Sequence, residues 1–206
     1  MFPSPEDHPS PTRLATNNQP NEFTSEERSI LLHLAHEAIL STLEKREIPS
    51  QPPSSHLAEH LAEPRGVFTT IHVHSALHGC VGLVLPVASL YRNVIETARS
   101  AAFEDTRFSP ITREEAAVLE ISLSILSPLI PMAPEEIEIG HHGLLISMAG
   151  RRGLLLPQVP VEHGWDRITF LEQTCKKAGL PLDAWKNGAR IEVFTAEVFG
   201  EQDTQS

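Results

Sequence analysis

Cysteine, aromatic residues and long apolar runs are all scarce in this chain, and each shortage excludes a class of protein. Two cysteines among 206 residues, Cys80 and Cys175, are too few for a disulfide scaffold, so we expect free thiols in a reducing compartment. No apolar run approaches the ~20 residues that a transmembrane helix needs. The first residues also lack the basic start and apolar stretch of a secretory signal. We therefore expect a cytoplasmic protein that does not enter the membrane.

The motifs of several enzyme classes are missing as well. The chain has no GxSxG elbow, no GxxxxGK(S/T) loop, no GxGxxG and no HExxH. P-loop nucleotide hydrolysis, a dinucleotide cofactor and zincin proteolysis are therefore without support. There is also no CxxC pair for structural zinc and no three-cysteine motif for an iron–sulfur cluster. We predict neither a metal nor a cofactor for this chain.

Acidic residues outnumber basic ones. Asp and Glu total 27 against 16 Lys and Arg, which gives a formal charge of −11. Binding to nucleic-acid phosphates needs a basic surface, so this charge disfavours a nucleic-acid partner, although it leaves a local basic patch open. Hydrophobic residues make up 40% of the chain and charged residues 21%, as in a folded globular domain, which excludes disorder throughout.

The order of the predicted elements indicates an α+β fold. We expect helices over 25–45, 90–102 and 167–178, strands over 67–74, 77–85, 119–126 and 190–199, and a hairpin over 144–156. Hairpins with helices between them favour a mainly antiparallel, partly barrel-like sheet flanked by helices. The order strand–strand–helix–strand occurs twice, at 67–127 and 143–198, which suggests a duplicated architecture.

The two ends of the chain differ from its middle. Residues 1–22 contain five prolines and no apolar periodicity, so we expect a disordered tail there. The folded domain is expected over 23–200, followed by a flexible end at 201–206. Thr24 and Glu27 match a capping box and mark the start of the first helix.

The hexapeptide Leu-His-Gly-Cys-Val-Gly at 77–82 is the first candidate site. Gly79 and Gly82 bracket Cys80 inside an apolar strand, and a glycine within a strand often marks the close approach of a ligand or of another backbone. His78 is a candidate base or cation for the Cys80 thiol. The alternative is that Cys80 is a small, buried apolar residue, as free cysteines often are.

Histidines near this hexapeptide raise the question of a metal site. If residues 75–76 form a two-residue hairpin loop, Ile71 pairs with Cys80, and His72 and His74 share the face opposite to His78 and Cys80. The His72-x-His74 pair alone supplies only two ligands. The predicted hairpin therefore argues against a metal, and chance spacing explains the histidines equally well.

Two further groups carry opposite charges in loops. Asp105 and Arg107 follow a predicted helix and could fix a ligand carboxylate, or could form a structural tie between themselves. Arg151 and Arg152 lie in the predicted tip of the hairpin over 144–156, where they could receive an anionic ligand or remain solvated turn residues. Cys175 lies on the apolar side of its helix and is predicted to be a packing residue.

At the hexapeptide the sequence resembles the AMMECR-type domain family, whose members include AmmeMemoRadiSam system protein A. The family signature has the form Leu-Arg-Gly-Cys-Ile-Gly. The resemblance extends over roughly 24–200 and includes these further segments: Gly66-Val67-Phe68, Asp105-Thr106-Arg107-Phe108, 121–128, 134–137, 142–144, 152–159, 164–166, 175–180 and Trp185. This chain departs from the family pattern at His78, where arginine is usual, and at Thr106, where proline is usual.

The resemblance implies an α+β fold with a larger and a smaller lobe, and a site in a cleft near the signature. It also implies association with a Memo-type protein and a radical S-adenosylmethionine protein. We expect an accessory component that binds an unidentified small ligand at Cys80, Gly79 and Gly82, with Asp105, Arg107 and Arg152 as further contacts. The alternatives are a thiol enzyme, with Cys80 as nucleophile and His78 as base, and a regulator of translation or nucleic-acid machinery.

Overall fold

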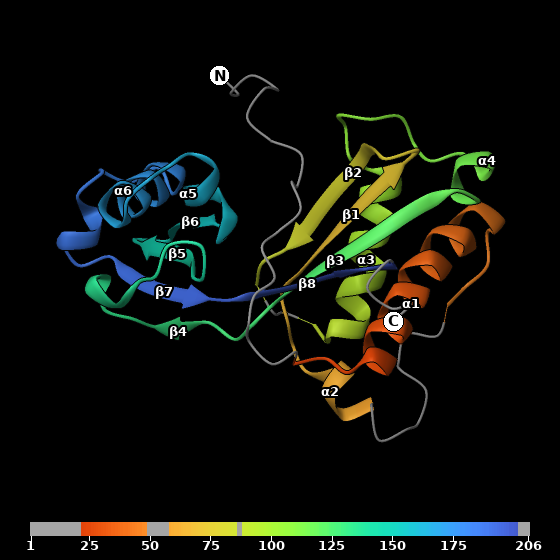
Figure 1. The fold of residues 1–206 in the computed structure, drawn as a ribbon, viewed down its shortest axis with the longest axis horizontal. Helices are drawn as coiled ribbons and strands as arrows, with labels where there is room; N and C mark the ends of the chain where they lie inside the picture. The colour runs from red at the N-terminus through yellow and green to blue at the C-terminus, as the bar shows by residue number, and fades with distance from the viewer. Residues whose placement is uncertain (1–21, 49–57, 86–87, 202–206) are drawn as a thin grey trace.

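The computed structural model describes residues 22–48, 58–85 and 88–201, which form two lobes, each built on a four-stranded antiparallel sheet (Figure 1). The predicted α+β class is confirmed, but the two sheets are separate and do not close into a barrel. The tail predicted at 1–22 and the flexible end at 201–206 lie outside the described residues except for Glu22 and Glu201. Among the described helices, none is long and apolar enough to cross a membrane.

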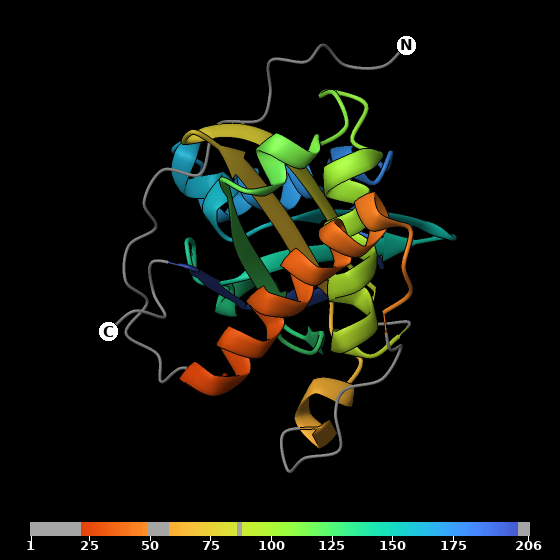
Figure 2. The same cartoon turned by 90° about the vertical axis from the view of Figure 1, so that its right-hand side faces the viewer.

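The larger lobe places two helices on one face of its sheet. Its elements are α1 (Ser25–Glu44), α2 (Ala58–Ala62), β1 (Val67–Val73), β2 (Ala76–Leu83), α3 (Leu90–Phe103), α4 (Arg113–Ala116), β3 (Leu119–Leu126) and β8 (Ala196–Gly200), with strand order β2-β1-β3-β8. The capping box predicted at Thr24 and Glu27 begins α1. Figure 2 shows α1 and α3 lying across the sheet, where Leu31, Ile71 and Val94 are fully buried in a common core.

The smaller lobe repeats this plan. Its strands are β4 (Ile130–Pro131), β5 (Gly143–Met148), β6 (Arg151–Leu155) and β7 (Arg190–Phe194), its helices are α5 (Gln158–Glu162) and α6 (Arg167–Lys177), and short 3₁₀ turns lie at Pro134–Glu136 and Ala184–Lys186. α6 packs Phe170 and Leu171 against Leu144 and Ile146 of the sheet. In both lobes the strand after the helix pairs with the first strand of the hairpin, giving the orders β2-β1-β3 and β6-β5-β7. The duplicated strand–strand–helix–strand plan is therefore present.

The chain also passes twice from one sheet to the other. β3 is followed by β4, which pairs with β7 in the smaller sheet, and β7 is followed by β8, which pairs with β3 in the larger sheet. Where the two connections meet, the Ser127 amide donates to the Thr195 carbonyl (2.9 Å) and the Thr195 amide donates to Ser127 Oγ (3.0 Å). The single strand predicted over 190–199 is therefore wrong, because the chain changes sheets at Thr195 (Figure 1).

Candidate functional site

The hexapeptide at 77–82 lies in β2, an edge strand of the larger sheet. Cys80 pairs with Thr70 of β1, and Thr70 pairs in turn with Ser122 of β3, so a thiol and two hydroxyls lie side by side across three strands. Their side chains are half-buried on the sheet face opposite the helices, which we call the thiol face and define by Phe68, Thr70, His72, Cys80, Ser122 and Ser124. The Thr70 hydroxyl donates a hydrogen bond to the Cys80 sulfur (3.3 Å).

The hairpin before Cys80 differs from the predicted one. Its turn is formed by His74 and Ser75, both with positive φ (50° and 63°), so Val73 pairs with Ala76. Two central residues with positive φ match the right-handed twist of the flanking strands, as in other two-residue hairpin turns. A bulge at His78 then moves the register back by one residue, so that Thr70, rather than the predicted Ile71, is opposite Cys80. The prediction that His72 and Cys80 occupy opposite faces is therefore wrong.

The two glycines of the hexapeptide are required by packing inside the lobe. A side chain at Gly79 would collide with the carbonyl oxygen of Ala101 in α3, and one at Gly82 would collide with the ring of Phe68. Protein atoms therefore occupy the space beside these two glycines, where the sequence predicted a bound ligand. The ligand contacts predicted for Gly79 and Gly82 stay predictions, and the glycines by themselves do not create an opening.

Asp105 and Arg107 hold the backbone of Cys80 from the loop after α3. The Cys80 amide donates to Asp105 Oδ2 (2.9 Å), and Arg107 Nη2 donates to the Cys80 carbonyl (3.1 Å). The same two side chains bind each other through two hydrogen bonds of 2.7 and 2.9 Å. Among the described strands, none pairs with β2 on this side, so the pair satisfies edge groups that a strand would otherwise satisfy. We call this pair the edge clamp.

The charge of the edge clamp is fixed at neutral pH. Hydrogen bonds from the Arg107 guanidinium, together with the amides of Cys80 and Arg107, lower the pKa of Asp105 to about 2. The carboxylate is largely buried, with 7% of its side chain exposed, whereas Arg107 is 34% exposed. The sequence left two interpretations of this pair open, a contact to a ligand carboxylate or a structural tie between the two side chains. The geometry directly supports the structural tie.

His78 is bound to the same loop. Its Nε2 lies 2.9 Å from the Ser109 carbonyl, and its ring stacks on Phe108 with 5.9 Å between centroids. Arg107 also lies over the Phe108 ring. Among the described residues, no hydrogen bond joins the His78 imidazole to the Cys80 thiol. The role of His78 as a base for Cys80 stays a prediction, and its contacts here are those of a loop anchor.

The remaining predicted residues lie elsewhere. Arg152 is in the second sheet, paired with Ser147, and belongs to strand β6 because the turn is formed by Ala149 and Gly150. The prediction that Arg152 is at the hairpin tip is therefore wrong. Within the described part of the chain, no group of three or more His, Cys, Asp or Glu side chains is arranged to hold a metal ion.

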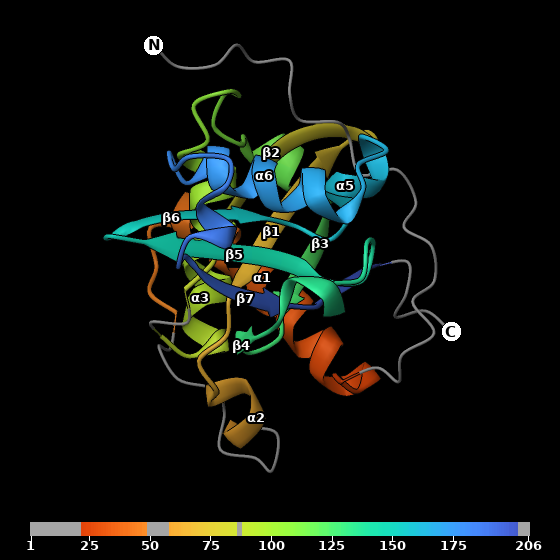
Figure 3. The same ribbon diagram turned by 90° about the vertical axis from the view of Figure 1, so that its left-hand side faces the viewer.

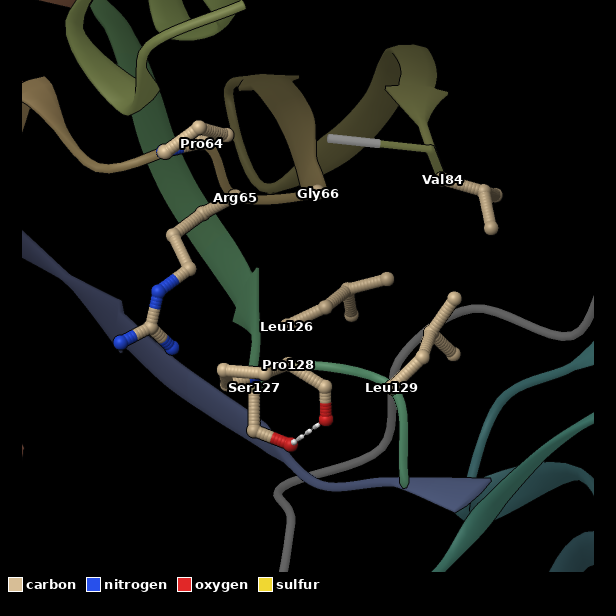
Figure 4. Close-up of a pocket in the computed structure, with 8 residues that line it drawn as sticks. All are labelled: Pro64, Arg65, Gly66, Val84, Leu126, Ser127, Pro128 and Leu129. Carbon is tan, nitrogen blue, oxygen red and sulfur yellow. Dashed lines mark hydrogen bonds between the residues drawn. The ribbon is translucent and has the colours of Figure 1, made fainter. Parts of the chain in front are cut away.

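A small pocket lies at the junction of the lobes, away from the hexapeptide. It is lined by Pro64, Arg65, Gly66, Val84, Leu126, Ser127, Pro128 and Leu129 (Figure 4). Its volume of about 10 Å³ leaves room for a single water molecule. The Arg65 guanidinium binds Glu22 and Glu63. This pocket is too small to bind a ligand larger than water.

Thr70, Phe108 and Ser109 complete the surroundings of the hexapeptide, and the sequence analysis missed all three as site residues. Thr70 would have been found from the correct hairpin register, since cross-strand partners share a face. Phe108 and Ser109 adjoin the predicted Asp105–Arg107 pair, but no sequence pattern shows that their loop folds back against β2.

Comparisons with known proteins agree on one family. The model of the AMMECR1 family matches residues 32–199. A protein of Aquifex aeolicus is 41% identical over 182 residues, which cover 84% of this chain and 92% of that protein. Protein MK0488 of Methanopyrus kandleri is 41% identical over 196 residues, covering 89% of this chain and 93% of its own. The crystal structure of the uncharacterized protein PH0010 from Pyrococcus horikoshii superposes with a TM-score of 0.69 at 37% identity, covering 84% of this chain and 90% of that one.

Proposed function

The chain belongs to the AMMECR1 family, and from this premise we propose that it is an accessory, small-ligand-binding component of a modification system of the AmmeMemoRadiSam type. Its partners in this proposal are a Memo-type protein and a radical S-adenosylmethionine protein. The radical chemistry belongs to the partner, because this chain lacks a three-cysteine motif for an iron–sulfur cluster. The proposal includes a cytoplasmic location, where Cys80 and Cys175 stay reduced.

We assign the ligand site to the thiol face around Cys80. The edge clamp supports this assignment, because it fixes the Cys80 backbone at both its amide and its carbonyl while leaving the side chain half-buried on the thiol face. A polar group held by packing and hydrogen bonds on a rigid strand is suited to specific recognition. The neighbouring hydroxyls of Thr70 and Ser122 add groups that can donate and accept. The expected ligand is therefore small and polar.

The geometry favours binding over nucleophilic catalysis. A catalytic thiol needs a base within hydrogen-bond reach, and His78 instead contacts Ser109 and Phe108. An oxyanion also needs free amide donors, and the Cys80 amide is already bound to Asp105. A regulator acting on nucleic acid is disfavoured by the formal charge of −11.

Blocking the thiol face tests the proposed site. Wild-type protein and the variants Cys80→Phe and Ser122→Phe are immobilised at low salt and exposed to a native cell lysate, and the retained small molecules are identified by mass spectrometry. The account predicts a small polar compound that the wild type retains and both variants lose, since each ring covers the thiol face. The matched control is Val118→Phe, an exposed apolar position of the same lobe (47% exposed), which should retain the compound.

Thermal unfolding of each variant accompanies the assay, so that only folded variants are compared. If both blocked variants stay folded and retain the same compounds as the wild type, the site assignment is wrong. The enzyme alternative is tested separately by the pH dependence of Cys80 alkylation. A rate constant at pH 6 well above that of a free small thiol would favour a nucleophile over a binding residue.

A further inference from the structure

Basic side chains gather at the end of the smaller lobe where the β5–β6 hairpin meets the C-terminal end of α6. We call this surface the basic end and define it by Arg151, Arg152, Lys176, Lys177, Lys186 and Arg190. Figure 3 shows the hairpin projecting at the left, with the segment that follows α6 beside it. The whole chain has a formal charge of −11, whereas the residues that define the basic end are all positively charged.

On one face of the smaller sheet, two arginines flank a hydroxyl. Ser147 of β5 pairs with Arg152 on one side and with Arg190 on the other, so the three side chains project from the same face. Neighbouring strands are about 4.8 Å apart, which places the two arginines about 10 Å apart at the backbone. Arg190 gives one hydrogen bond to Glu192 (2.7 Å), yet its side chain stays 64% exposed.

The other cations lie on the α6 side of the sheet, across the edge strand β6, because Gly153 faces α6 and its neighbour Arg152 faces away from it. Arg151 Nη1 donates to the Gly179 carbonyl (2.6 Å), which brings the hairpin against the end of α6. Lys176 and Lys177 are exposed in the last turn of that helix, and Lys186 lies over the Trp185 ring. The acids here are Glu172, Asp183 and Glu192, of which Asp183 binds Asn187 and Glu192 binds Arg190.

Three basic side chains of the basic end remain available to bind a partner. Within the described residues, no salt bridge joins Arg152, Lys176 or Lys177 to an acidic side chain. We propose that the basic end binds an acidic segment of a partner protein. The Arg152 guanidinium binds a carboxylate of that segment. Guanidinium groups bind carboxylates through two parallel hydrogen bonds, which supplies specificity as well as charge.

The charge of the rest of the molecule favours this partner over a nucleic acid. A long polyanion would meet the acidic surface of the larger lobe once it extended beyond the basic end, whereas a short acidic segment would not. A second copy of this chain is disfavoured for the same reason, because two molecules of net charge −11 repel each other.

The experiment uses a labelled decaglutamate peptide as the probe and measures its binding by fluorescence anisotropy. The wild type should bind at low salt, with an affinity that falls as salt is added. The double variant Arg152→Glu and Lys177→Glu should bind about tenfold more weakly or worse, since it reverses two charges of the basic end. The control Arg92→Glu and Arg113→Glu makes the same change in net charge on the larger lobe and should bind within about twofold of wild type.

Every other result overturns the inference. Absence of peptide binding to the wild type, or an equal loss in the control, would show that the basic end has no specific role. Tighter binding of an oligothymidylate of matched charge would assign the surface to nucleic acid. Self-association seen by light scattering, and abolished in the double variant, would assign it to a second copy. The thiol-face experiment is independent of all these outcomes, because none of the altered residues lies on that face.

Discussion

The two lobes are built on one plan, and a glycine occupies the equivalent place in each. Gly79 of β2 lies against the backbone of Ala101 in α3, and Gly153 of β6 lies against Ala178 and Thr174 at the end of α6. Each glycine pairs with an isoleucine of the preceding strand, Ile71 in one lobe and Ile146 in the other. The comparison shows that the glycine before Cys80 is required by the architecture, since it lets the helix approach the edge strand.

The residue after the glycine is where the lobes differ. It is Cys80 in the larger lobe, with its backbone held by the edge clamp, and Leu154 in the smaller lobe. The cysteine of the smaller lobe, Cys175, lies instead in α6 and is 0% exposed. The fold therefore explains the glycine but not the cysteine. In the larger lobe a thiol, Cys80, occupies the position that Leu154 occupies in the smaller lobe. The shared fold does not require this thiol, and this is why we place the ligand site at Cys80.

The largest expected effect is a difference in the alkylation rates of the two cysteines. Iodoacetamide should modify Cys80 in the folded protein at least ~1000-fold faster than Cys175, because Cys175 reacts only after opening of its lobe. Burial also raises the pKa of the Cys175 thiol, which slows its reaction further. Mass spectrometry of the two cysteine peptides over time measures both rates. Equal rates would contradict the burial on which the comparison depends.

Replacing the two equivalent glycines should have similar costs. We expect Gly79→Ala and Gly153→Ala each to lower the free energy of unfolding by about 1–3 kcal/mol, because the added methyl group meets helix backbone that cannot move aside. Urea unfolding measures the loss. Gly200→Ala is the matched control in a strand, since its Cβ would lie 3.4 Å from the nearest atom. A loss at Gly79 no larger than at Gly200 would break the comparison between the lobes.

Acid should release the edge clamp. The pKa of Asp105 is about 2 in the folded protein against an ordinary value of 3.8, so its contribution to stability is present above pH 3.8 and lost as the pH falls toward 2. The shift corresponds to roughly 2 kcal/mol. Asp105→Asn removes this contribution, so we expect wild type and variant to differ in unfolding free energy at pH 7 and to converge near pH 2. A difference that is independent of pH would contradict the assignment.

The smallest effect is expected at His78. His78→Ala removes the contacts with Ser109 and Phe108 and should cost about 0.5–1.5 kcal/mol of unfolding free energy. His78→Arg introduces the residue that is usual in the resembling family, and a guanidinium can also donate to a carbonyl and stack on a ring. We therefore expect His78→Arg to unfold within about 0.5 kcal/mol of wild type. A loss as large as that of His78→Ala would show that the imidazole is specifically needed.

Local patterns in the sequence predicted much of the fold. The capping box at Thr24 and Glu27, together with the apolar repeat behind it, placed α1 almost to the residue. The alternation over 119–126 likewise predicted β3, because one of its faces is buried in the core beneath α1 while the other is not. Both signals reflect contacts within a helix turn or on one strand face, and these are encoded locally.

Features that depend on distant contacts escaped prediction. His74 and Ser75 form a turn with positive φ although neither is glycine, so nothing in the sequence marked the true hairpin register. The alternation over 190–199 runs unbroken through Thr195, where the chain leaves one sheet for the other. At the candidate site, the sequence singled out Asp105 and Arg107, but their hydrogen bonds to the Cys80 backbone depend on a loop that folds back from α3.

The central claim is that the thiol face around Cys80 binds a small polar ligand. Its most direct test is the rate of Cys80 alkylation in the presence and absence of the low-molecular-mass fraction of a cell extract, with a free small thiol in the same reaction as internal standard. The account predicts that the extract slows the modification of Cys80 relative to the standard and that dialysis restores the original rate. An unchanged ratio of the two rates, with and without extract, would contradict it.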